Sequence, residues 1–146
     1  RKLMRDQGAT AKVVFGEIQA TVQALAASGK PELQAIGQRL GSALKAWVAA
    51  TEWLAANAKT GLSGILAAAV PYLHLAVTVC GGWFMGKAAL AASGYLATGE
   101  GDQAFYRAKI ATARFYADQL LPQAAAYAET VMAGDAALAG VGDEVF

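Results

Sequence analysis

Apolar residues recur at spacings of three and four through most of the chain, which is the pattern of helices that bury one face. This pattern predicts a first helix over residues 3–28, and Gly29 stands where a left-handed glycine can end it. A second helix is predicted over 32–58. Pro31 suits its first turn, because a backbone N–H would be unpaired there in any case. Both predicted helices are long and amphipathic.

The third predicted helix, over residues 71–98, differs because it is apolar on every side. The residues between Lys59 and Lys87 carry no charge except for a possible proton on His74. A helix that is apolar all round is the most buried member of a bundle, so we expect this helix at the centre. A membrane span is disfavoured, because only about 16 apolar residues separate Pro71 from Lys87 and a span needs about 20.

A fourth helix is predicted over residues 103–132. Asp102 precedes it and can accept hydrogen bonds from its first backbone N–H groups. Pro122 lies inside this range and removes one backbone hydrogen bond, which predicts a kink near Asp118. The segment 135–146 has no sustained period and is expected to be a loosely held tail.

Composition narrows the fold class. Hydrophobic residues make up 56% of the 146 residues and charged residues only 16%, against about 25% charged in an average soluble domain. Together with the four predicted helices, this indicates an all-α protein. We expect one domain over residues 1–134, folded as an antiparallel up-and-down four-helix bundle. The net charge of +1 gives no concentrated positive field, so nucleic acid is not expected as a partner.

Candidate catalytic residues are few. Cys80 is the single cysteine, which excludes an internal disulfide and is compatible with a reducing compartment; we expect a cytoplasmic protein. His74 is the single histidine and lies about 240° around a helix from Cys80, so the two form no dyad. Glu100 and Asp102 lie in a turn, where capping explains Asp102 better than catalysis does. The sequence predicts no catalytic, cofactor-binding or metal-binding residue within the chain.

The remaining notable residues predict packing and association. Gly82 and Gly86 are spaced to let a neighbouring helix approach closely. Arg114 and Asp118 stand four apart on a helix and are expected to pair on a solvated face. The chain has too few charged residues to cover its whole surface, which leaves apolar surface exposed to water. We therefore expect the chain to associate with a second copy of itself or with the rest of a larger protein. Four bulky residues are our interface candidates: Val48, Trp53, Trp83 and Tyr106.

Several short segments occur in a characteristic order. They are Tyr72-Leu73-His74-Leu75, Gly81-Gly82-Trp83, Gly99-Glu100-Gly101-Asp102, Arg107-Ala108-Lys109, Thr112-Ala113-Arg114-Phe115-Tyr116 and Leu120-Leu121-Pro122-Gln123. Their order and spacing resemble the C-terminal helical domain appended to a branch of acyl-CoA dehydrogenases. The resemblance is sharpest over residues 71–134. Over residues 1–60 the helix pattern carries it, together with a likeness of Arg1-Lys2-Leu3 to the junction that follows the catalytic core.

The resemblance implies a parent enzyme that oxidises an acyl-CoA thioester to its α,β-enoyl form. In that family a glutamate removes the α-proton, FAD accepts the β-hydride, and both belong to core domains upstream. No glutamate of this chain matches that motif, so we expect the chain alone to be inactive and without FAD. The implied partners are the missing catalytic core and further copies of the subunit, while acyl-CoA and an electron acceptor are met only through the parent.

A different class of protein stays open at this point. The apolar third helix would also suit a free-standing helical interaction module or a membrane-associated one. The reading frame upstream of Arg1 separates these alternatives, because only the first hypothesis requires a flavin-binding core there.

Overall fold

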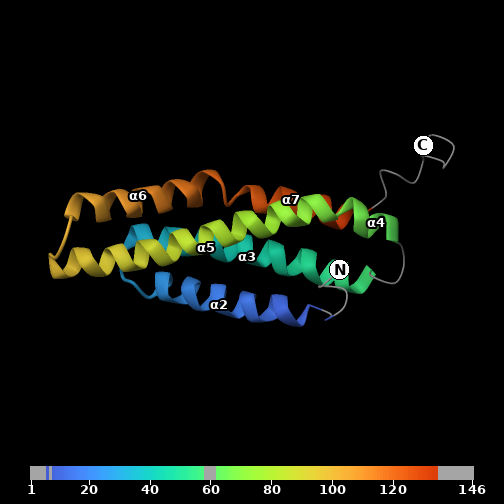
Figure 1. Cartoon of the computed structure of the whole chain (residues 1–146), viewed down its shortest axis with the longest axis horizontal. Coiled ribbons are helices and arrows are strands. Elements are labelled where there is room, and N and C mark those ends of the chain that lie inside the picture. Colours follow the sequence, from blue (N-terminus) through green and yellow to red (C-terminus); the bar gives the residue numbers. More distant parts are fainter. Residues whose placement is uncertain (1–5, 7, 58–61, 135–146) are drawn as a thin grey trace.

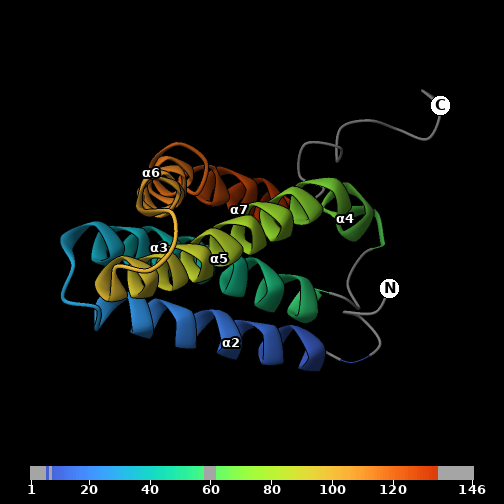
Figure 2. The same cartoon turned by 60° about the vertical axis from the view of Figure 1, so that its left-hand side comes forward.

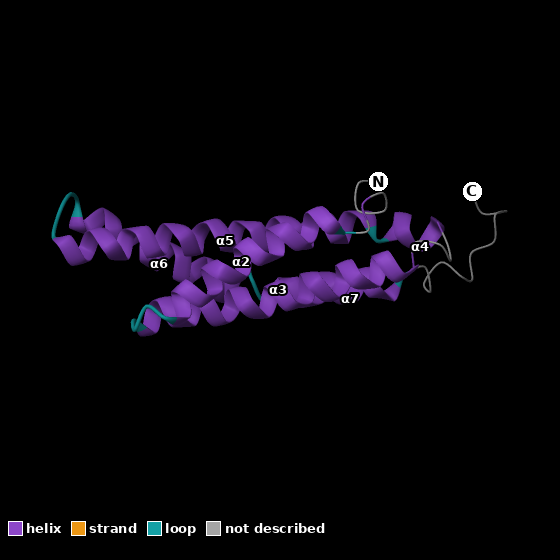
Figure 3. Ribbon diagram, turned by 90° about the horizontal axis from the view of Figure 1, so that it is seen from below, coloured by secondary structure: helices purple, strands orange, loops and turns teal. Residues whose placement is uncertain are grey.

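A computed structural model describes residues 6, 8–57 and 62–134, and these residues form helices and no strand (Figure 3). The helices are α2 (Ala9–Ala26), α3 (Pro31–Asn57), α4 (Leu62–Ala67), α5 (Ala69–Thr98), α6 (Gln103–Gln119) and α7 (Gln123–Ala133). The predicted all-α bundle is therefore confirmed. The predicted tail, 135–146, lies outside the described residues.

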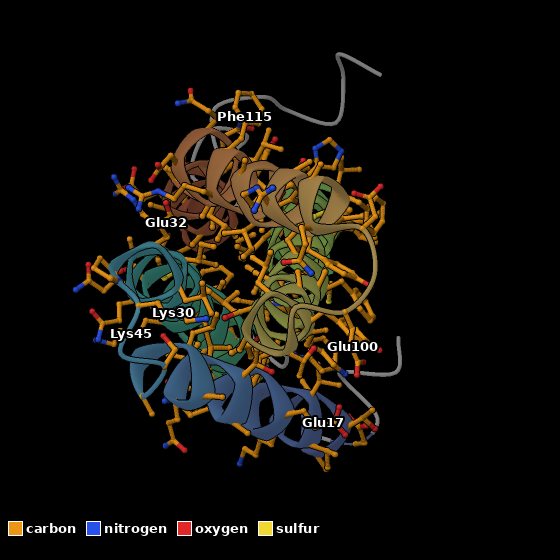
Figure 4. The ribbon with its side chains drawn as sticks, turned by 90° about the vertical axis from the view of Figure 1, so that its left-hand side faces the viewer. Glu17, Lys30, Glu32, Lys45, Glu100 and Phe115 are labelled. Carbon is orange, nitrogen blue, oxygen red and sulfur yellow. The ribbon has the colours of Figure 1, made fainter. Side chains whose placement is uncertain are left out.

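The helices make four rods that run alternately up and down, with α6 and α7 together forming the fourth (Figure 1). Helices α3 and α5 lie in the middle and contact each other, and both contact α2 on one side and α6 and α7 on the other (Figure 2). An end-on view shows the same arrangement, with α2 and α6 at opposite corners (Figure 4). Helices α3 and α5 are thus the shared walls of the bundle.

Apolar side chains from every rod fill the interior. The largest fully buried ones are Ile18, Leu25, Leu33, Ile36, Leu40, Leu75, Leu121, Val79 and Val131. Glycines bring the rods together, since a Cβ on Gly86 would lie 3.1 Å from the Leu25 side chain of α2. A Cβ on Gly82 would lie 2.5 Å from Cδ2 of Leu121. The close approach predicted for Gly82 and Gly86 is confirmed, although the two glycines face different helices.

The ends of the predicted helices are partly corrected. Helix α2 ends at Ala26, and Gly29 takes its left-handed conformation (φ 68°) in the following connection rather than directly on the helix. Helix α5 begins before Pro71, which occupies its first turn, where the missing N–H breaks no bond. The short helix α4 was not predicted. At the other end of α5, Gly99 is left-handed (φ 73°) and terminates the helix.

The fourth rod is broken rather than kinked. Helix α6 ends at Gln119, and the backbone N–H groups of Leu120 and Leu121 both bond to the carbonyl of Tyr116, at 3.0 and 3.2 Å. Pro122 cannot continue the ladder, so α7 starts as a new helix after it. The prediction of one helix over 103–132 with a kink near Asp118 is therefore wrong. The break turns Leu121 into the core, where it is 2% exposed.

Polar side chains make hydrogen bonds at two of the connections between helices, the one between α2 and α3 and the one between α5 and α6. The Asp102 carboxylate accepts hydrogen bonds from the N–H groups of Ala104 and Phe105, at 2.9 and 3.0 Å, so the predicted cap is confirmed. At the same end of the bundle, the ammonium of Lys30 donates to the hydroxyl of Ser93 on α5, and Figure 4 shows Lys30 reaching inward. The Lys30 contact holds the connection between α2 and α3 against α5, and the Asp102 contact caps the start of α6.

Candidate interaction surface

The residues with possible chemistry are held in packing contacts. Within the described part of the chain, no group of three or more His, Cys, Asp and Glu residues could hold a metal ion. His74 is exposed and meets the ring of Tyr127 edge-on, at 5.4 Å between centroids. Burial raises the pKa of the Cys80 thiol, which keeps it protonated and weakly nucleophilic. These side chains therefore show no activated nucleophile.

Tyr116 lies beside Cys80 and is also engaged. Its hydroxyl donates to the carbonyl oxygen of Thr78 on α5, at 3.1 Å. Burial, and secondarily the negative charge of a Cys80 thiolate, raise the pKa of the Tyr116 phenol. The phenol stays protonated and ties α6 to α5, which is a structural role.

The Arg114–Asp118 pair predicted from spacing is confirmed, and the structure adds a third member. Asp118 accepts a hydrogen bond from Nε of Arg114 and lies 3.4 Å from Nε of Arg39 on α3. The hydrogen bond from Arg114 is the main cause that lowers the pKa of the Asp118 carboxyl. The contact with Arg39 joins α3 to α6 and could not be predicted from spacing along one helix.

This pair predicts a pH dependence. Because the folded pKa of Asp118 is below the unfolded value of about 3.9, the carboxylate stabilises the fold above that pH and loses this contribution as pH falls through the folded pKa. We expect Asp118→Asn to be less stable than wild type near neutral pH, with a difference that shrinks towards zero at acid pH. Urea unfolding across a pH series measures it, and a difference that grows as pH falls would contradict it.

An open groove lies between α2 and α3, with a volume of about 1050 Å³. Its lining includes the polar residues Gln19, Gln34, Gln38, Arg39, Ser42, Lys45 and Arg114. Two of its cations, Arg39 and Arg114, already pair with Asp118. The groove presents no carboxylate and no histidine among its lining residues, so it offers no acid–base pair.

The four interface candidates from the sequence are half-buried and lie apart. Trp83 donates its indole N–H to the hydroxyl of Thr21, at 2.8 Å, and Tyr106 stacks on Tyr95 at 4.9 Å between ring centroids. Trp53 lies close to Gly134, and Val48 packs against the core. The structure does not bring these four together on one face. Their part in an interface stays a prediction.

Most of the exposed apolar surface lies on α4 and α5 instead. Six of the ten large apolar residues found exposed in the described part of the chain belong to these helices, and each is between 49% and 64% exposed. They are Leu66, Val70, Leu73, Val77, Phe84 and Tyr95. The expectation that the third helix is the most buried is therefore wrong. Helix α5 directs Leu75, Val79 and Ala89 inward, while its outward side is equally apolar and remains open.

Five of these residues lie on one side of α4 and α5, and we call them the α5 seam: Leu66, Val70, Leu73, Val77 and Phe84. The sequence did not predict this seam, because a helix that is apolar on every side shows no polar face to mark its exposed side. The spacing of the bulky residues alone could have found it, since they recur at four, three, four and seven positions.

Among the described residues one helical stretch, Gly64–Thr98, is long and apolar enough to cross a membrane, judged by length and composition only. The buried core helix of a soluble protein passes the same test. Spanning a membrane would require withdrawing Leu75 and Val79 from the core, where both are fully buried. It would also expose to water the apolar side chains of α2, α3, α6 and α7 that pack on α5, and this exposure favours a helix that stays in the bundle.

Fold and surface together define a small helical bundle with one open apolar face and no assembled catalytic group among the described residues. Residues 14–141 match the family described as acetyl-CoA dehydrogenase C-terminal like. The chain is also 40% identical, over 126 residues, to the 3-methylmercaptopropionyl-CoA dehydrogenase of Ruegeria pomeroyi (strain ATCC 700808 / DSM 15171 / DSS-3). The match covers 86% of this chain and 21% of that relative.

The chain belongs to the acyl-CoA dehydrogenase C-terminal domain family, and the resemblance seen in its sequence is confirmed. It spans about a fifth of the length of the curated relative that it matches.

Proposed function

We propose that this chain is the C-terminal domain of an FAD-dependent acyl-CoA dehydrogenase, in which it packs against the catalytic core and takes part in subunit association. Family membership supports the parent activity, since the relative is named as a dehydrogenase of an acyl-CoA thioester. The observation that carries the association role is the row of exposed apolar side chains on α4 and α5. Soluble monomers rarely leave an apolar face of this kind in water.

The described residues do not fit FAD. A dinucleotide site needs a glycine-rich turn between a strand and a helix, so that free backbone N–H groups meet the phosphates. The turn at Gly99–Asp102 instead follows helix α5, and the Asp102 carboxylate already occupies the first N–H groups of α6. A carboxylate at that position also repels phosphate. The cofactor of the proposed parent therefore belongs to other parts of the polypeptide, and no catalytic step is assigned to this chain.

The isolated chain is expected to bind no flavin and to oxidise no acyl-CoA. We expect this because the Asp102 carboxylate occupies the N-terminus of α6 and because no glutamate of the chain matches the catalytic motif of the family. Purified chain mixed with FAD and passed through a desalting column should emerge colourless. Stoichiometric flavin absorbance in the protein fraction would contradict this expectation.

The proposal itself is tested on the whole gene product. The reading frame that contains this chain should also encode a flavin-binding core, and its product should dehydrogenate an acyl-CoA with an artificial electron acceptor. Deleting the segment that corresponds to residues 9–134 should lower the melting temperature and the fraction of FAD retained. A frame without a flavin core would overturn the proposal and favour a free-standing interaction or membrane-associated module.

A further inference from the structure

We draw no further inference here: the strongest candidate, the α5 seam on the exposed apolar side of α4 and α5, carries nothing beyond the association already proposed, because nothing in the described residues shows what covers it.

Discussion

Gly82→Leu is expected to destabilise the bundle by about 1–3 kcal/mol or more, through overpacking where α5 meets the break between α6 and α7. Even a Cβ at this position would lie 2.5 Å from Cδ2 and 3.0 Å from Cγ of Leu121. Leu121 is 2% exposed, so it can move out of the way only by displacing the core side chains around it or by leaving the core. Urea unfolding of wild type and variant measures the loss of free energy of unfolding.

Gly94→Ala is the matched control on the same helix. No heavy atom lies within 4 Å of a Cβ built on Gly94, so an added methyl group meets open space. Alanine is the better helix former, and this variant should gain about 0.5–1 kcal/mol. If Gly82→Leu unfolded at the same urea concentration as wild type, the close contact between Gly82 and Leu121 would be refuted.

Leu121→Ala is expected to cost about 2–5 kcal/mol, because a buried leucine is lost and the surrounding helices refill its space only in part. The neighbouring Leu120→Ala is the control, since Leu120 is 36% exposed and contributes less to the core. Thermal and urea unfolding should rank Leu121→Ala far below Leu120→Ala. Equal losses would show that the break does not direct Leu121 into the core.

The two sites should also be coupled. Shortening Leu121 opens space in front of Gly82, so Gly82→Ala should be tolerated better in the Leu121→Ala background than in wild type. A double-mutant cycle measures this interaction free energy, which for residues in contact is about 0.5–3 kcal/mol. Strictly additive losses would place the two side chains out of contact.

Local signals in the sequence predicted local structure well. The spacing of apolar residues predicted the ends of α3 and α5 to within two residues, but it missed α4 and joined α6 and α7 into one helix. The cap at Asp102 and the pair Arg114–Asp118 followed from short-range geometry and are confirmed. The family resemblance rested on the order of several short segments, and the family match now confirms it.

Two predictions, a kink at Pro122 and a third helix that is the most buried one, are wrong for the same reason: both features depend on contacts between distant segments. Pro122 was given the weaker effect of a kink, because the sequence does not show that Leu121 must turn inward to meet Gly82. The second error is the expectation that α5 is the most buried helix, which rests on the apolar character of every side of it. Burial depends on where the neighbouring rods lie, and α2, α3, α6 and α7 leave one side of α5 uncovered.

The sequence by itself determined an all-α bundle and its family, because helix periodicity, caps and motif spacing are properties of residues close together in the chain. Only the tertiary structure decided which apolar face is covered. Leu75 and Val77 are equally apolar and two positions apart, yet the first is fully buried and the second is 62% exposed. That difference arises from contacts between distant segments, and it separates the core of this domain from the surface by which we propose it associates.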